Sequence, residues 1–138
     1  GYRVLNYPFG DLTTDAMNRY GEGKWENNDQ LKWVPTRTDG KLEIALPVKK
    51  SGRYALSGVF TKSYDYAIVQ LYLDGKKLGN PIDFYAGSFI PTEPMPFGEH
   101  ELAAGEHVVT VEIVGINEKA RKWGYMFGLD YFKLEPVP

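Results

Sequence analysis

The chain has 138 residues, a net charge of −2 and no cysteine, and this length is enough for one domain with its own buried core. Disulfides and thiolate metal sites are therefore excluded, and the interspersed acids and bases do not favour a nucleic-acid-binding surface. No apolar run approaches the roughly 18 residues of a membrane-spanning helix, so no membrane span is expected.

Most of the sequence alternates between apolar and polar residues, which is typical of strands with one buried face. In chain order, the segments with this pattern are 30–34, 41–47, 53–60, 67–73, 107–114 and 125–134. Residues 13–21 are expected to form one helical turn at most. Turns such as Asp74-Gly75 separate the apolar runs and supply the positive φ angles that tight hairpins need.

These strands predict an all-β fold. Because most of them have one apolar and one polar face, two packed antiparallel sheets fit better than a closed barrel. We expect a β-sandwich with jelly-roll topology and eight or nine strands, formed by residues 1–138 as a single domain. The pattern supports residues 1–24 least, and residues 135–138 resemble the start of a linker.

Three stretches carry a family resemblance: "SGRYALSGVFTKSYDYAIVQLYLDGKKLG", "LAAGEHVVTVEIVGIN" and "GYMFGLDYFKL". Together they resemble the galactose-binding-like, carbohydrate-binding-module-like jelly-roll domains appended to bacterial glycoside hydrolases, over roughly residues 25–134. The resemblance implies a fold that presents sugars to aromatic residues in end loops or on a concave sheet. It also implies a structural Ca²⁺ in many members. The better-known sugar-binding relatives open with a calcium-binding glutamate pair, which the opening "GYRVLNYPFGDLTTD" lacks.

Asp130 is the candidate metal ligand, because it lies within the apolar run that ends the chain. A buried carboxylate needs partners. Calcium is one, with Asp11 or Asp15 as a further ligand. The favoured alternative is a structural carboxylate that accepts backbone N–H groups at a β-bulge, which Gly128 would permit. The cofactor expected is therefore none, or a structural Ca²⁺.

The candidate carbohydrate-binding residues are aromatic and polar residues of predicted loops. A flat ring can stack on the C–H face of a sugar, while amides and carboxylates bind its hydroxyls. For each ring, packing over the end of the sandwich is the alternative. The set comprises Trp25, Tyr64, Asp65, Tyr66, Asn117 and Trp123.

Other chemistry has little support in the sequence. His100 and His107 flank one hairpin, but no third metal ligand follows from their spacing, so solvated hairpin residues are the preferred interpretation. The sequence has no nucleophile elbow and no phosphate-binding glycine loop. No catalytic residue is predicted, and the chain is not expected to be an enzyme.

The leading functional hypothesis is a non-catalytic module that binds a polysaccharide or other glycan, targeting a tethered enzyme or a cell surface to it. The expected location is secreted, cell-surface or periplasmic, of bacterial type. The alternative is a structural or interaction domain that packs against a neighbouring catalytic domain or self-associates. That alternative predicts an exposed apolar patch containing Val59, Ile68 and Tyr72. A lyase or hydrolase with this sandwich fold is the third hypothesis.

Overall fold

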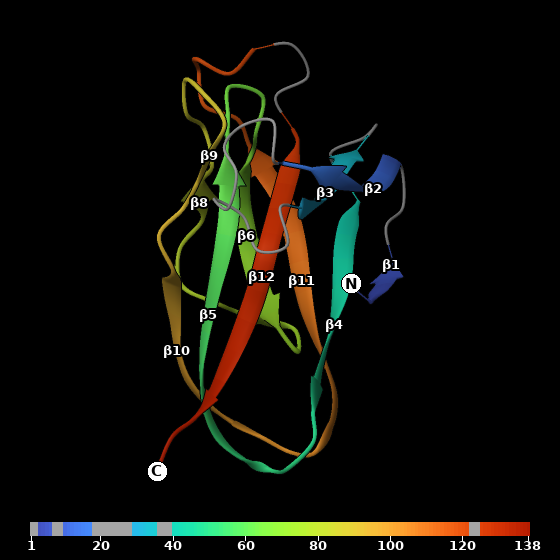
Figure 1. The fold of residues 1–138 in the computed structure, drawn as a ribbon, viewed down its shortest axis with the longest axis vertical. Coiled ribbons are helices and arrows are strands. Elements are labelled where there is room, and N and C mark those ends of the chain that lie inside the picture. Colours follow the sequence, from blue (N-terminus) through green and yellow to red (C-terminus); the bar gives the residue numbers. More distant parts are fainter. Residues whose placement is uncertain (1–2, 7–9, 18–28, 36–39, 122–124) are drawn as a thin grey trace.

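A computed structural model of the chain describes residues 3–6, 10–17, 29–35, 40–121 and 125–138. Its strands form two antiparallel sheets that pack face to face (Figure 1). The β11 sheet has the order β1 (Val4–Asn6), β4 (Lys41–Val48), β11 (Gly105–Gly115), β6 (Ile68–Leu73) and β7 (Lys76–Lys77), with β8 (Ile82–Asp83) also paired to β6. The β12 sheet has the order β10 (Met95–Leu102), β5 (Gly52–Lys62), β12 (Phe127–Pro136), β3 (Asp29–Pro35) and β2 (Gly10–Ala16), with β9 (Ile90–Pro91) also paired to β5.

The predicted all-β sandwich with jelly-roll topology is confirmed. The described residues contain twelve strands, of which three (β7, β8 and β9) have only two residues, so nine longer strands form the two sheets. All the six predicted strand segments are present, extended or trimmed by a few residues. No part of the described chain forms a helix suited to crossing a membrane.

The core lies between the sheets, where the period-2 alternation places the apolar side chains. In β11, Val109, Val111 and Ile113 are buried, and the first two are paired with Ile44 and Leu42 of β4. Complete burial of each such side chain contributes about 1.5–3 kcal/mol. The alternation of the sequence therefore fixes which face of each sheet is turned inward.

Phe60 of β5 occupies the centre of an aromatic group in this core. Its ring is fully buried and has four aromatic neighbours among the described residues. The centroid distances are 5.0 Å to Phe84, 5.8 Å to Phe132, and 6.0 Å to both Phe97 and Phe127. Phe84 follows β8, while the other three belong to β10 and β12, so this ring joins segments far apart in the sequence.

Two expectations differ from the structure at particular residues. The helical turn expected over 13–21 is wrong for residues 13–16, which belong to β2, and 18–21 lie outside the described residues. The strand residues pair with β3 from Gly10↔Pro35 to Ala16↔Asp29. Val59, expected on an exposed outer face, is buried at 5% exposure. The predicted patch of Val59, Ile68 and Tyr72 is therefore not an exposed apolar surface.

A β-bulge in β12 explains the charge within the final apolar run. Leu129 is paired with Phe60, and Tyr131 is paired with Val59. These two residues of β12 are two positions apart, whereas their partners in β5 are adjacent. Asp130 is the extra residue, and it shifts the alternation by one position. Phe127 and Leu129 face the core before the bulge, and Phe132 and Leu134 pack against it afterwards. Asp130 is itself buried at 4% exposure, as expected for a charge within this apolar run.

Candidate functional site

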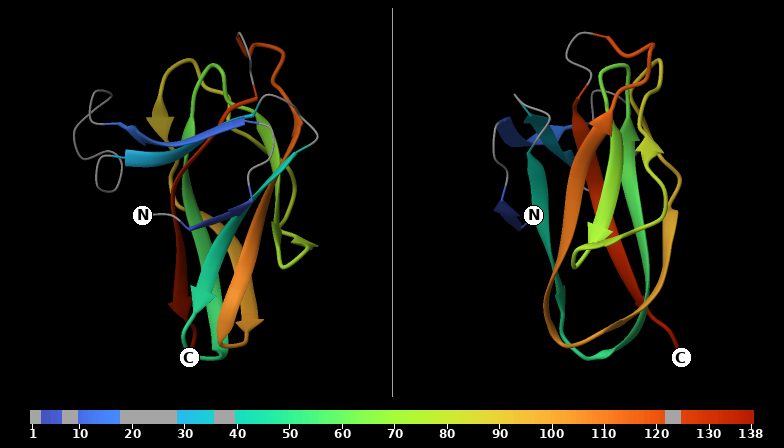
Figure 2. Two further views of the ribbon diagram at one scale, coloured as in Figure 1. Left: turned by 90° about the vertical axis from the view of Figure 1, so that its right-hand side faces the viewer. Right: turned by 180° about the vertical axis from the view of Figure 1, so that it is seen from behind.

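Three segments far apart in the sequence meet at one end of the sandwich, and we call this surface the loop end (Figures 1 and 2). They are residues 63–67 after β5, 83–92 around β9, and, between β11 and β12, the described residues 116–121 and 125–126. Backbone hydrogen bonds join them: the N–H of Arg121 donates to the Tyr64 carbonyl at 2.8 Å, and the N–H of Ala86 donates to the Ser63 carbonyl at 3.1 Å. The loop end is thus a bonded structure with a defined geometry.

Tyr64 is the predicted ring that the structure places best for contact with a ligand. It is half-buried, and its ring meets that of Phe89 edge to face at a centroid distance of 5.7 Å. The loop end also exposes two apolar side chains, Ile90 at 40% and Ile116 at 39%. An aromatic ring fixed by a second ring loses little conformational freedom on binding, which favours a stacking role for Tyr64.

Tyr66 is buried completely, so the expectation of an available ring at this position is wrong. Its hydroxyl accepts a hydrogen bond from Nε2 of Gln30 at 2.8 Å, and the Oε1 of Gln30 accepts one from the hydroxyl of Thr61. This buried network links β3, β5 and the segment that follows β5. Tyr66 holds the base of the loop end together rather than forming its surface.

Asp65 and Asn117 also take part in the structure of the loop end. Asp65 is buried at 7% exposure, and its carbonyl accepts the N–H of Met126 at 3.1 Å. The side-chain amide of Asn117 donates to Oδ2 of Asp83 at 2.8 Å, and its Oδ1 accepts the N–H of Lys119 at 2.9 Å. One amide hydrogen and one lone pair of Asn117 remain for a ligand.

Asp83 was missed by the sequence interpretation although it organises the loop end. Its Oδ1 accepts the N–H of Tyr85 at 2.9 Å, and its Oδ2 binds Asn117. An aspartate that accepts the backbone N–H two residues later is a local turn signal that could have been read from the sequence. Its bond to Asn117, 34 positions away, depends on the fold.

The other two predicted rings, Trp25 and Trp123, lie outside the described residues. Their roles therefore stay predictions. Exposed Arg121 and Lys119, close to Trp123 in the sequence, add cationic hydrogen-bond donors to the loop end. The described part of this surface thus combines a braced ring, exposed apolar groups, an amide and positive charge.

The described residues do not complete a metal site. Asp130 is buried at 4% exposure at the bulge, but no group of three or more His, Asp or Glu residues in the described chain is arranged to hold an ion. The side chains of Asp11 and Asp15, the suggested further ligands, lie outside the described part. Calcium binding by Asp130 stays a prediction.

The two histidines of the β10–β11 hairpin bind protein atoms. Nδ1 of His107 lies 2.5 Å from Oδ2 of Asp74, and its Nε2 lies 2.7 Å from the Ala103 carbonyl. Both partners are acceptors, so the charged imidazolium, with two N–H donors, is favoured. The Ala103 carbonyl and the Asp74 carboxylate together raise the pKa of His107. In His100, Nε2 lies 2.7 Å from the Phe97 carbonyl.

The sequence matches no protein-family model and no curated protein. Solved structures do match. A Paenibacillus xanthan lyase is 20% identical with a TM-score of 0.73, covering 97% of this chain and 12% of the lyase. A Podospora anserina GH26-CBM35 β-(1,4)-mannanase is 16% identical with a TM-score of 0.56, covering 100% of this chain and 28% of the mannanase.

A third match is a family 35 carbohydrate-binding module from an environmental isolate, 10% identical with a TM-score of 0.51, covering 99% of this chain and 93% of that module. The chain thus spans about an eighth of the lyase and just over a quarter of the mannanase, but nearly all of the module. At these identities the likeness concerns the fold. This chain therefore has the jelly-roll fold of a carbohydrate-binding module, which also occurs as one part of much longer enzymes.

Proposed function

We propose that this chain is a non-catalytic carbohydrate-binding module and that it binds glycans at the loop end. The observation that carries the proposal is the convergence of three loops around Tyr64, with its ring braced by Phe89 and exposed apolar and amide groups beside it. A sugar offers an apolar C–H face and several hydroxyls, and this combination suits both.

The sugar would stack on Tyr64. Its hydroxyls would form hydrogen bonds with the remaining amide hydrogen and lone pair of Asn117 and with the cationic groups of Lys119 and Arg121. Few side chains take part, so the affinity of one site would be weak, and the benefit would come from a tether that keeps an enzyme near its substrate. A secreted or cell-surface location and a tethered catalytic domain belong to the same proposal, supported by the enzymes whose chains contain this fold.

Affinity electrophoresis through gels containing soluble polysaccharides tests this proposal. The native chain should be retarded by at least one polysaccharide, and Tyr64→Ala should weaken the binding about tenfold, the loss of one stacking contact of about 1.4 kcal/mol. Tyr72→Ala is the matched control, because Tyr72 is another half-buried tyrosine, on β6 and outside the loop end. Trp25→Ala and Trp123→Ala test the predicted rings outside the described residues.

Two results would count against the proposal. The first is no retardation by any polysaccharide. The second is equal retardation of native chain, Tyr64→Ala, Trp25→Ala and Trp123→Ala, which would leave the loop end without a role.

The second candidate function, an interaction domain, is supported by one observation. At the end of β11, Val114 is 48% exposed and Ile116 is 39% exposed, beside a small hollow of about 170 Å³ that Tyr125 also lines. Light scattering on the isolated chain tests self-association at this surface. A dimer that Val114→Ser converts to a monomer would support it, and a monomeric native chain would refute it.

A further inference from the structure

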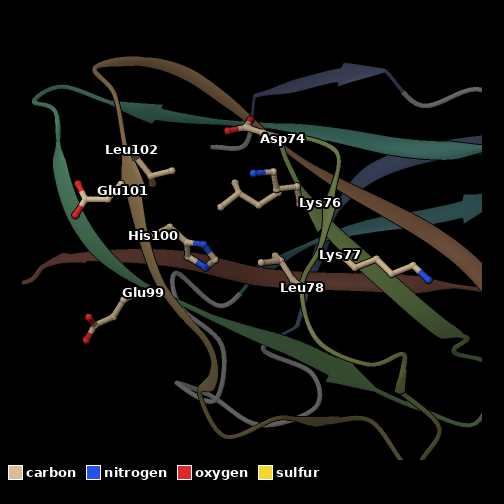
Figure 3. Close-up of a pocket in the computed structure, with 9 residues that line it drawn as sticks. Asp74, Lys76, Lys77, Leu78, Glu99, His100, Glu101 and Leu102 are labelled. Atoms are coloured by element: carbon tan, nitrogen blue, oxygen red, sulfur yellow. The ribbon is translucent and has the colours of Figure 1, made fainter.

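A second hollow, of about 470 Å³, lies between the edges of the two sheets, away from the loop end (Figure 3). One wall is the β6–β7 hairpin and the other is the end of β10. Its volume falls within the range of about 300–1,000 Å³ that small-molecule sites occupy. From Ile68, where β6 leaves the loop end, to Leu73 the strand rises five residues, or about 17 Å. This hollow, which we call the edge hollow, is therefore a separate place on the molecule.

The inner lining of the edge hollow is apolar. Leu73, Leu78 and Leu102 each have only 5% of their surface exposed and belong to the hydrophobic core. The His100 ring lies in the hollow opposite Leu78 (Figure 3). The buried leucines thus form an apolar floor, and the His100 ring adds a flat face beside it.

The acidic groups around the edge hollow are already paired. Glu99 and Glu101 point away from it (Figure 3), and their carboxylates lie 2.9 and 3.3 Å from the guanidinium of Arg53. Asp74 holds His107 and also accepts the N–H of Val108 at 2.9 Å. Because the two glutamates point away and Asp74 is bonded to His107 and Val108, these carboxylates are not directed at a ligand in the hollow.

The basic groups, by contrast, are available. Within the described chain, neither Lys76 nor Lys77 forms an ion pair, and Lys76 extends over the hollow on the side facing His100 (Figure 3). A carbonyl can only accept, so the contact of His100 with Phe97 places a proton on Nε2. Nδ1 then has a lone pair that can accept a hydrogen bond from a ligand hydroxyl.

We propose that the edge hollow binds an anionic sugar residue, one that carries a carboxylate or a sulfate ester. This inference rests on the proposed function that the chain binds glycans, and it adds a second site and a charge preference. The oxyanion lies at the Lys76 ammonium, a hydroxyl of the sugar donates to Nδ1 of His100, and the sugar ring lies over the apolar floor of the hollow. The charge-assisted hydrogen bond from the Lys76 ammonium makes an oxyanion preferable to a hydroxyl here.

The test is an NMR titration of the ¹⁵N-labelled chain with an oligogalacturonate and with its methyl ester, which has the same backbone without charge. A sulfated carrageenan oligosaccharide and its desulfated form test whether a sulfate ester, rather than a carboxylate, is the oxyanion that binds. Binding of a charged oligosaccharide should shift the backbone amides of residues 73–78 and 99–102, and the matched uncharged form should not. Equal shifts from both forms, or none in these segments, would overturn the inference.

Substitutions make the test specific to the lysine in the hollow. Lys76→Gln should weaken binding at these amides about tenfold, the loss of one charge-assisted hydrogen bond. Lys49→Gln makes the same charge change on an exposed lysine that does not line the hollow, and it should leave the affinity unchanged. If the two variants lose affinity equally, the attraction is general to the net charge and the site does not exist.

The same spectra separate this inference from the proposed function. Shifts of Tyr64 and Asn117 amides alone would support the loop end and refute the edge hollow. Shifts confined to residues 73–78 and 99–102 would support the edge hollow and refute the loop end as the glycan site. No shift in either region with any of the oligosaccharides would refute both.

Discussion

Replacing Gly128 with alanine should lower the free energy of unfolding of the sandwich by several kcal/mol, because the position has no room for a Cβ atom. Gly128 lies in β12, opposite Lys32 of β3, over the buried Gln30 side chain. An added Cβ would overlap Oε1 of Gln30 and lie 2.9 Å from both the Cδ of Gln30 and the Cε2 of Tyr66. All these atoms are buried, so one of the two side chains must move.

The expected loss follows from what the displaced side chain holds. Overpacking a core costs about 1–3 kcal/mol. Moving Gln30 also strains its hydrogen bonds with Tyr66 and Thr61, and a buried polar group left without its partner costs about 1–3 kcal/mol. The two contributions together amount to about 2–6 kcal/mol, which is a large part of the roughly 5–15 kcal/mol that stabilises a domain.

Urea denaturation followed by tryptophan fluorescence measures the change in the free energy of unfolding. Gly87→Ala is the matched control, because an added Cβ there meets nothing within 4 Å and should change stability by less than about 1 kcal/mol. On a Gln30→Ala background, where the obstructing side chain is absent, Gly128→Ala should cost much less. If Gly128→Ala is as harmless as Gly87→Ala, the proposed close packing of Gln30 against β12 is wrong.

Three further predictions concern the core, the hairpin and the loop end. Phe60→Ala should cost about 3–5 kcal/mol in urea denaturation, because its ring joins four others; a loss below about 1 kcal/mol would contradict that role. The Ala103 carbonyl and the Asp74 carboxylate raise the pKa of His107. Their contribution to the free energy of unfolding is therefore complete below about pH 6.5 and is lost as the pH rises through the folded-state pKa. As the pH rises through this range, the urea midpoint of the native chain should fall relative to that of His107→Gln. Parallel pH profiles of the two proteins would refute this. Asp83→Ala should speed hydrogen exchange at the amides of Tyr85 and Lys119, whereas unchanged exchange would show that Asp83 does not hold these loops.

The sequence allowed the sheets to be predicted because alternation is a local property. Segments such as 41–47 and 107–114 show it over seven or eight residues, and each became a strand with the predicted inner face. Residues 10–16 and 95–102 became strands without a clear alternation, because their partners β3 and β5 supply the hydrogen bonds. The periodicity of a single segment cannot reveal its pairing with strands that are distant in the sequence.

The loop end could be predicted only in part, for the same reason. The sequence indicated that Tyr64, Asp65, Tyr66 and Asn117 lie in segments flanking strands, but it did not show which side chains the fold turns inward. Tyr66 forms a parallel β-bridge with Met126, and its side chain is buried beneath the loop end. Both rings meet Phe89 edge to face, but Tyr64 is only half-buried whereas Tyr66 is fully buried.

The bulge at Asp130 links the stability of the sandwich to the site at its end. Without the extra residue, the alternation of β12 would continue, and either Leu129 or Phe132 would leave the core. With it, both face inward, and Leu129 remains paired with Phe60 at the base of the loop end. The polar residues buried nearby, Gln30, Thr61 and Asp130, thus lie where a regular strand changes phase beneath the loops. A surface that binds a flexible sugar needs such a fixed base, because a ring that must first be ordered gives up part of its binding free energy.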